Sequence, residues 1–502
     1  MQRPRGIDIP SRDDSLLAKS TELIGGPLGE RTSPGRVRTG FFSVERVLLL
    51  MVLLSAVLAL IFKDHCRQLG WLTPDQFSTA CYSQLPNAFM EHDLARLFPY
   101  FSPGSSFGYP PVAGFIAGVT AWLSGFAGTG GAQVLAFFDL NAVLLTVVWI
   151  LGVLALARTH RLRPWDAAIF AASPLMLFIA FSSWDLWAAA LGAVALFLFS
   201  RRRTGWAGVV LGLGCAVQPY LILVLLALLL AAWRRGAVLR VVPTMAAALL
   251  AWLIINLPPL MLNPSSWLSY WQDGWNNEAA TGSIYAIVTA LGERLGGVGF
   301  TGLDASWTSL LLICVGIAAI SLLNFRASRP PRAATLAFLL VGWFLLVDKF
   351  AAPEHLIWLL PLLALARPRW RSALIWQVFG LLWYLGQLLY LGVILGDNNT
   401  QHGIDMPYFV LAAFAAGLAT LALIGLMLRE VLYPEHDIVR RRGVDDPLFQ
   451  WLPELPPSRP SRHPAHLAVA ESTLPAGDTP TGNQTNNLSG NLAKQHDLRQ
   501  HD

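Results

Sequence analysis

Charged residues are scarce in this chain of 502 residues: Asp, Glu, Lys and Arg make up 13%, whereas 54% of the residues are hydrophobic. Soluble globular domains carry about 25% charged residues, so the composition excludes an ordinary soluble protein. Long apolar runs without any charge occur instead, and the first covers residues 47–62. Only a closed helix satisfies its own backbone groups in lipid. The sequence therefore predicts an all-α, polytopic integral membrane protein.

The signatures of several enzyme and transporter classes are also missing from the sequence. It contains no Walker loop, which argues against a nucleotide-driven pump, and no GxSxG elbow of a serine hydrolase. It contains neither HExxH nor Cys/His pairs at zinc-site spacing. Few ionisable residues lie within the apolar runs, which disfavours an ion-coupled transporter. We therefore expect no cofactor and no metal.

Cysteine is rare as well, with four residues in the whole chain. Cys215 and Cys314 lie in apolar runs and are expected to be small core residues. Cys66 and Cys81 share one predicted loop, where a disulfide and a free pair are both compatible with the sequence.

The net charge of +5 comes from arginines that flank apolar runs, in clusters at 201–203, 234–235, 367–371 and 440–442. This is the positive-inside pattern of membrane proteins and not the signature of a nucleic-acid partner. If these clusters are cytoplasmic, the spans alternate between them and leave both termini in the cytoplasm. The chain is then a multi-pass protein of the plasma membrane whose inferred partners are membrane lipids, and no protein partner is inferred.

The same alternation divides the chain into four parts. Residues 1–43 form a disordered cytoplasmic N-terminus and residues 44–428 form the transmembrane domain. That domain has about 12 spans, a re-entrant or interfacial segment at 111–126, and large extracytoplasmic loops at 63–110 and 258–305. Residues 429–452 form a cytoplasmic juxtamembrane segment, and residues 453–502 form a disordered tail.

Local patterns predict several details of the transmembrane domain. Apolar spacing over 84–97 predicts a helix on the membrane surface, and 165–182 is predicted to be one span. Pro219 is expected to break a pair of short helices, and the glycines of 205–214 are expected to pack helices together. The segment 356–366 is too short to cross alone and is either tilted or packed within protein.

The predicted topology collects most polar clusters on the extracytoplasmic side, where we expect the site. In the first loop, Glu91 and Asp93 either belong to a solvated amphipathic helix or supply a general base for a hydroxyl. Asp185 follows an apolar stretch and either faces water at the end of a span or takes part in the site. These alternatives remain open from the residues alone.

Two further clusters on that side suggest a ligand. Asp348 and Lys349 form either a structural ion pair or, with His355, a cationic site for an anionic head group such as a phosphate. Trp275 and Asn276 belong to a loop rich in Trp and Asn, which suits either a membrane interface or the binding of a sugar.

The chain resembles the GT-C membrane glycosyltransferases, and within them glycosyltransferase family 87, from the first span to about Trp451. The resemblance rests on the order of short motifs, each weak alone. They are Cys-Tyr-Ser at 81–83, Phe-Pro-Tyr at 98–100, Tyr-Pro-Pro at 109–111, Ser-Pro at 173–174, Trp-Asp at 184–185, Trp-Ala-Gly at 206–208, Asn-Leu-Pro at 256–258, Gly-Ser-Ile at 282–284, Asp-Lys at 348–349, Ile-Trp-Leu-Leu-Pro at 357–361 and Asp-Asp-Pro at 445–447.

The resemblance implies a hexosyltransferase that takes a sugar, with mannose expected, from a polyprenyl phosphate. The acceptor would be an envelope glycolipid or glycan outside the membrane. It implies an acidic general base in the first loop, for which Asp93 is the first choice and Glu91 the second, with Asp185 as an orienting carboxylate. The implied donor-phosphate ligands are Lys349 and His355. The implied acceptor or sugar contacts are Tyr82, Gln84, Tyr109, Trp275 and Asn276.

Two positions depart from the family pattern. Relatives usually carry Asp where this chain has Gln84, and Lys where it has Gln218. Either the base has moved to Asp93 or Glu91, or the protein is a catalytically impaired protein that binds or transports lipid-linked sugars. A purely structural partner of an envelope-building complex is a third hypothesis.

Overall fold

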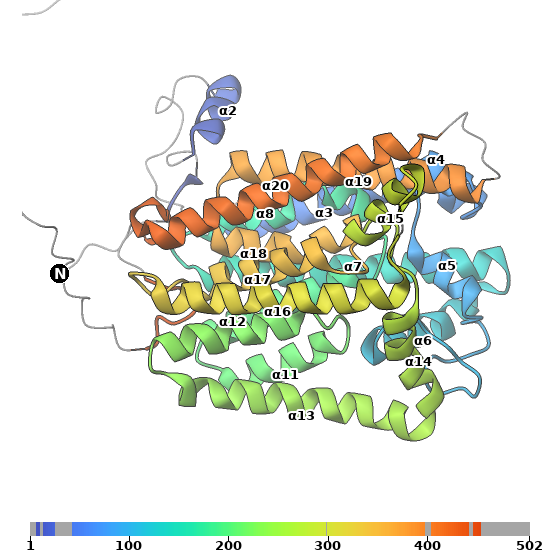
Figure 1. Cartoon of the computed structure of the whole chain (residues 1–502), viewed down its shortest axis with the longest axis horizontal. Helices are drawn as coiled ribbons and strands as arrows, with labels where there is room; N and C mark the ends of the chain where they lie inside the picture. The colour runs from blue at the N-terminus through green and yellow to red at the C-terminus, as the bar shows by residue number, and fades with distance from the viewer. Residues whose placement is uncertain are drawn as a thin grey trace, which may run out of the picture. The chain divides into compact units, whose positions relative to one another are not determined.

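The computed structural model describes residues 7–10, 14–25, 43–297, 299–396, 403–440 and 445–452. Within these ranges the chain folds into helices without any β-strand, which confirms the all-α prediction. In this described part of the chain, six helices are long and apolar enough to cross a membrane. Figure 1 shows them running side by side along one direction. They are α3 (Val44–Leu69), α7 (Gly131–Thr159), α13 (Val238–Leu262), α16 (Gly302–Arg326), α19 (Trp370–Leu395) and α20 (Met406–Leu432).

Shorter apolar helices fill the space between the long ones. They are α6 (Pro111–Ser124) with the 3-10 turn η1 (Gly125–Ala127), α10 (Asp185–Ser200), α11 (Thr204–Cys215), α12 (Leu221–Arg234), α17 (Ala333–Val347), and α18 (Leu359–Ala366) preceded by the 3-10 helix η3 (Pro353–Trp358). A hydrocarbon core about 30 Å thick needs about 20 residues of helix. Within the described residues, six of the predicted 12 or so spans correspond to helices of spanning length and five to shorter helices, while the sixth shorter helix is the segment 111–126 that was predicted to be re-entrant or interfacial. Every residue of α18 is buried, so the short segment 356–366 is packed within protein.

The predicted single span at 165–182 is wrong, because the chain there forms only short turns. These are η2 (Pro164–Ala167), α8 (Ala168–Ala171) and α9 (Met176–Ile179). The backbone groups released by these breaks are bound by neighbouring side chains. The carbonyl of Phe170 accepts from Trp149 Nε1 at 3.2 Å, and that of Ala171 accepts from Ser55 Oγ at 3.0 Å. Irregular backbone is tolerated at membrane depth when protein buries it in this way.

The glycine-rich segment 205–214 forms α11 and packs against α13, as predicted. A Cβ atom on Gly208 would lie 2.2 Å from Thr244 O, and one on Gly212 would lie 2.3 Å from Ala248 O. Thr244 Oγ1 donates a hydrogen bond to Thr204 O at 3.0 Å across the same contact. Glycine is therefore required for the close approach of the two backbones. Pro219 lies in the break between α11 and α12, also as predicted.

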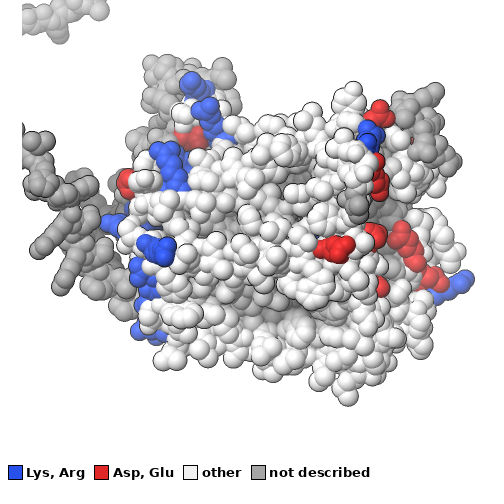
Figure 2. All heavy atoms as spheres, in the orientation of Figure 1, with Lys and Arg blue, Asp and Glu red and all other residues white. Residues whose placement is uncertain are grey.

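Charge is separated between the two ends of the helix bundle. Figure 2 shows most of the visible Lys and Arg at the left end and most of the visible Asp and Glu toward the right, with a broad uncharged band between them. We call the end that carries Arg201 and Arg234 the basic end, and the end that carries Glu91, Asp93 and Glu278 the acidic end. Such a band between two charged ends suits a protein that lies across a bilayer.

Buried ion pairs hold the segment after α20 against the basic end. Arg332, only 2% exposed, pairs with Asp437 at 2.7 Å and donates to the carbonyls of Leu365 and Ala366. Arg235 pairs with the buried Asp446 at 3.1 Å. Part of the predicted juxtamembrane segment 429–452 is therefore built into the fold, and the predicted tail 453–502 lies outside the described residues.

The N-terminal segment 1–43, predicted to be disordered, contains the helix α2 (Ser15–Gly25). Asp14, just before this helix, accepts a hydrogen bond from the backbone N–H of Trp370 at 3.0 Å. Asp8 donates its backbone N–H to Leu162 O at 2.7 Å and lies 3.4 Å from Arg163. The prediction of disorder therefore does not hold for these residues, which lie against the basic end.

Candidate active site at the acidic end

The first loop of the acidic end is fixed to α3 by a disulfide and a buried lysine. Cys66 and Cys81 are bridged, which answers the question that the sequence left open. Lys63 is fully buried and donates to Tyr82 O at 2.6 Å, to Ser182 Oγ at 3.3 Å and to Tyr384 Oη at 3.3 Å. An ammonium group has three donors, so all of them are used within the protein. Lys63 therefore holds the first loop in place. The sequence did not predict this role, because Lys63 simply follows an apolar run.

Tyr82, Gln84 and Tyr109, three of the predicted contact residues, lie together at this end. Ser83 caps α5 (Gln84–Glu91) by accepting from Leu85 N at 3.3 Å. The backbone N–H of Gln84 donates to Ser182 O at 2.8 Å, and its side-chain carbonyl accepts from the hydroxyl of Tyr109. Both tyrosines are half-buried and Gln84 is exposed. Gln84 therefore links the first loop to Ser182 and to Tyr109.

Asp185 opens α10 and is 2% exposed. Its carboxylate accepts from Ser183 Oγ at 2.5 Å, from Gln218 Nε2 at 2.6 Å and from Trp358 Nε1 at 3.1 Å. The three donors satisfy the buried charge, as a carboxylate in this environment requires. They also tie together α10, the break after α11 and η3. Asp185 is therefore a point of attachment for three segments that are distant in sequence.

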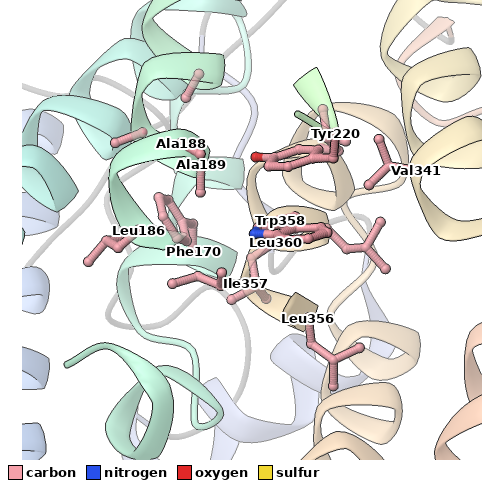
Figure 3. Close-up of a cluster of buried hydrophobic side chains, with 14 of the residues drawn as sticks. Phe170, Leu186, Ala188, Ala189, Tyr220, Val341, Leu356, Ile357, Trp358 and Leu360 are labelled. Atoms are coloured by element: carbon pink, nitrogen blue, oxygen red, sulfur yellow. The ribbon is translucent and has the colours of Figure 1, made fainter. Parts of the chain in front are cut away.

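A stack of three rings continues from Trp358 of η3. Its indole lies 4.3 Å from the ring of Tyr220 at 9° on one side and 4.2 Å from the ring of His355 at 16°. Figure 3 shows the rings of Tyr220 and Trp358 lying parallel among the buried apolar side chains. His355 is half-buried, and its Nδ1 is buried with no hydrogen-bond partner within the described residues. The imidazole is thus held by stacking, and its Nδ1 makes no hydrogen bond to the described part of the chain.

Glu354 and Asp348 bring two more carboxylates to this place. Both are half-buried, and burial raises the pKa of each. Burial raises the pKa of Tyr82 and of Tyr109, and the charge of Glu354 adds to both rises; the charge of His355 opposes the rise at Asp348. We call Asp185, Asp348, Glu354 and His355 the outer cluster. Within the described residues no three His, Cys, Asp or Glu lie close enough together to hold a metal ion.

Residues 107–348 match the model of glycosyltransferase family 87. The matched segment is just under half of the chain and contains Tyr109, Asp185, Gln218 and Trp275. No curated protein matches the chain. The match to family 87, together with the apolar helices, indicates a multi-pass membrane glycosyltransferase with a sugar donor and an acceptor.

The family 87 match ends just before Lys349, whose ammonium faces protein oxygens. It donates to Trp275 O at 3.0 Å and to Ser306 Oγ at 2.9 Å, and the residue is 3% exposed. Two of its three donors therefore pin the end of α14 (Pro264–Asn276) to α16. The ring of Trp275 packs edge-on against Trp307 at 5.1 Å, and Asn276 is exposed. These residues lie at the acidic end, where their contacts are with α14 and α16.

The predicted bases lie at the rim of the site. The predicted helix over 84–97 is too long, since α5 ends at Glu91 and Asp93 has a positive φ of 44°. Asp93 is exposed and its nearest cation is Arg96, at 4.0 Å. Glu91 is also exposed, and its charge contributes to the raised pKa of Tyr82. Glu354 was not among the predicted site residues, although it directly precedes His355.

Proposed function

We propose that the protein transfers a hexose, with mannose as the first candidate, from a polyprenyl phosphate to a glycolipid or glycan of the envelope. The transfer takes place on the extracytoplasmic side of the plasma membrane, at the acidic end. In this orientation the basic end and both termini face the cytoplasm, and the loops 63–110 and 258–305 face outward.

The observation that carries the proposal is the outer cluster itself. It holds three carboxylates and a histidine at the end of the bundle opposite the arginines, and the charge of Glu354 acts on the hydroxyls of Tyr82 and Tyr109. A hydroxyl that attacks an anomeric carbon needs a nearby base, and the departing phosphate needs a cation or hydrogen-bond donor. Both kinds of group are present. The half-buried rings of Tyr82 and Tyr109 add the flat surfaces on which sugars stack.

His355 is the better of the two predicted donor-phosphate ligands. Its Nδ1 has no hydrogen-bond partner within the described residues, and stacking on Trp358 fixes the ring. Lys349 keeps one free donor after binding Trp275 O and Ser306 Oγ. We assign His355 as the residue that binds the donor phosphate. We place Lys349 beside the phosphate, where the positive charge of the lysine also attracts it.

A second function, binding or transport of a lipid-linked sugar without transfer, is supported by the two glutamines. Gln84 presents its carbonyl to Tyr109, and Gln218 presents its amide to Asp185. Neither side chain can take up a proton as a base, and neither carries a positive charge.

The test uses membranes that contain the full-length protein and radiolabelled polyprenyl-phosphate mannose, with the corresponding glucose donor in parallel. Label moving into lipid or glycan material, above the level of membranes without the protein, supports the transferase. Donor that is bound and recovered intact supports the binding protein. Cysteine labelling of Asp93→Cys and Glu278→Cys from outside cells tests the orientation, and labelling only from the cytoplasmic side refutes it.

A further inference from the structure

We propose that the general base of this transferase is the carboxylate of Glu354, and not that of Asp93 or Glu91. The inference rests on the proposed function and assigns the residue that takes the proton from the acceptor hydroxyl.

The first argument is the availability of the carboxylate oxygens. No side chain within the described residues donates a hydrogen bond to Glu354, and the residue is half-buried. The other carboxylates of the outer cluster are occupied: Asp185 by three side-chain donors, and Asp348 by the backbone N–H groups of Lys349 and Phe350. A base must accept a hydrogen bond from the reacting hydroxyl, so it needs a free lone pair. Glu354 has one.

The second argument is position. The charge of Glu354 acts on Tyr82 and Tyr109, which come from the first loop, and on Lys63 and Tyr384 of two long helices. The turn η3, which carries Glu354, packs against α10 and α19, and Glu354 therefore lies within electrostatic range of the first loop, α3 and α19. Asp93, by contrast, is exposed beside Arg96. Of the two predicted bases, only Glu91 is close enough to influence Tyr82.

The third argument is rigidity. Glu354 follows Pro353 at the start of η3, and η3 is anchored one turn later by Trp358. The indole of Trp358 donates to Asp185 and stacks on Tyr220. A base on such an anchored turn keeps a fixed position relative to His355, the next residue. This pairing puts a proton acceptor and the proposed phosphate ligand on one rigid segment.

The reaction balances without a further reactant. The acceptor oxygen forms a bond to the anomeric carbon as its proton passes to Glu354. The bond from that carbon to the phosphate oxygen breaks, and the polyprenyl phosphate leaves with the electron pair. Glu354 then returns the proton to the departing phosphate or to water.

The experiment compares Glu354→Gln with Glu91→Gln, Asp93→Asn and Glu293→Gln in the transfer assay. The last is a matched control, since Glu293 is exposed on α15 (Ile284–Arg294) at the same end. Loss of a general base lowers kcat by about 100- to 10,000-fold. We expect a loss of that size for Glu354→Gln alone, with donor binding unchanged and near wild-type rates for the other three variants.

The outcomes separate this inference from the proposed function. Wild-type activity in Glu354→Gln, or a loss of that size in Glu91→Gln or Asp93→Asn instead, overturns the inference and leaves the transferase standing. A wild-type protein that transfers no sugar overturns both. If Glu354→Gln does not accumulate, Glu354→Asp replaces it; a lowered kcat with unchanged donor binding then supports the inference, and an unchanged kcat refutes it. Recovery of Glu354→Ala by added formate supports a chemical role, which a structural role would not produce.

Discussion

The contact between α11 and α13 allows one prediction to be worked out in detail. In Gly212→Ala the new Cβ would lie 2.3 Å from Ala248 O and 2.9 Å from the Cβ of Ala251. Carbon atoms in contact lie about 3.5–4.0 Å apart, and the nearest neighbour is backbone, which cannot rotate away. The two helices must therefore separate by about 1 Å at this point. Overpacking of this kind costs about 1–3 kcal/mol, while replacing a helical glycine returns about 1 kcal/mol.

We therefore expect Gly212→Ala to lower the stability of the protein by up to about 2 kcal/mol. The assay is thermal unfolding of the purified protein in detergent, in which the fraction that stays monodisperse after heating gives an apparent midpoint. Gly205→Ala is the control, because its Cβ meets nothing within 4 Å. Its midpoint should equal or exceed that of the wild type. A Gly212→Ala protein as stable as the Gly205→Ala protein would refute the close packing of α11 on α13.

Three further predictions concern the two ends of the bundle. Arg332→Met should take the nearest cation from the buried Asp437, which keeps Arg440 at 3.7 Å, and cost about 3–5 kcal/mol; the double variant with Asp437→Leu should recover part of the loss in the same unfolding assay. Replacing Cys66 and Cys81 by serine removes a cross-link between residues 15 apart in sequence, which should lower stability by about 3 kcal/mol; an unchanged midpoint in oxidised and reduced protein would contradict this. Burial raises the pKa of Glu354. The active ionised form is therefore lost as the pH falls through that raised pKa, and the acid limb of the transfer rate should lie above the ordinary titration range of glutamate. An acid limb within the ordinary titration range of glutamate would argue against Glu354 as the general base.

The disulfide and Lys63 illustrate what sequence could not decide at the acidic end. The spacing of Cys66 and Cys81 allowed either a bridge or free thiols, and the outcome depends on where α3 ends. That helix continues to Leu69, past the predicted end at residue 62, and so brings Cys66 next to Cys81. Lys63 looked like a polar residue after a span, but in the fold it meets three oxygens from distant segments.

The membrane class, most of the helices and the separation of charge follow from the sequence alone. Lipid offers no hydrogen bonds, so the backbone groups of an apolar run must bond to each other within one helix. Because these bonds join residues close together in the chain, the helix can be predicted from the local sequence. The glycines of α11 and the break at Pro219 were predictable for the same reason. Proline and glycine act on their own backbone and immediate neighbours.

The outer cluster and the broken segment at 165–182 depended on tertiary structure. The breaks in that segment are stable only because Ser55 and Trp149, from other helices, bind the released carbonyls. In the same way, the place of Glu354 depends on Trp358, which is held by Asp185 more than 170 residues earlier. Contacts between segments so far apart in the chain leave no periodic pattern in the sequence, because the residues around each partner look the same whether or not the contact forms. Only packing brings them together.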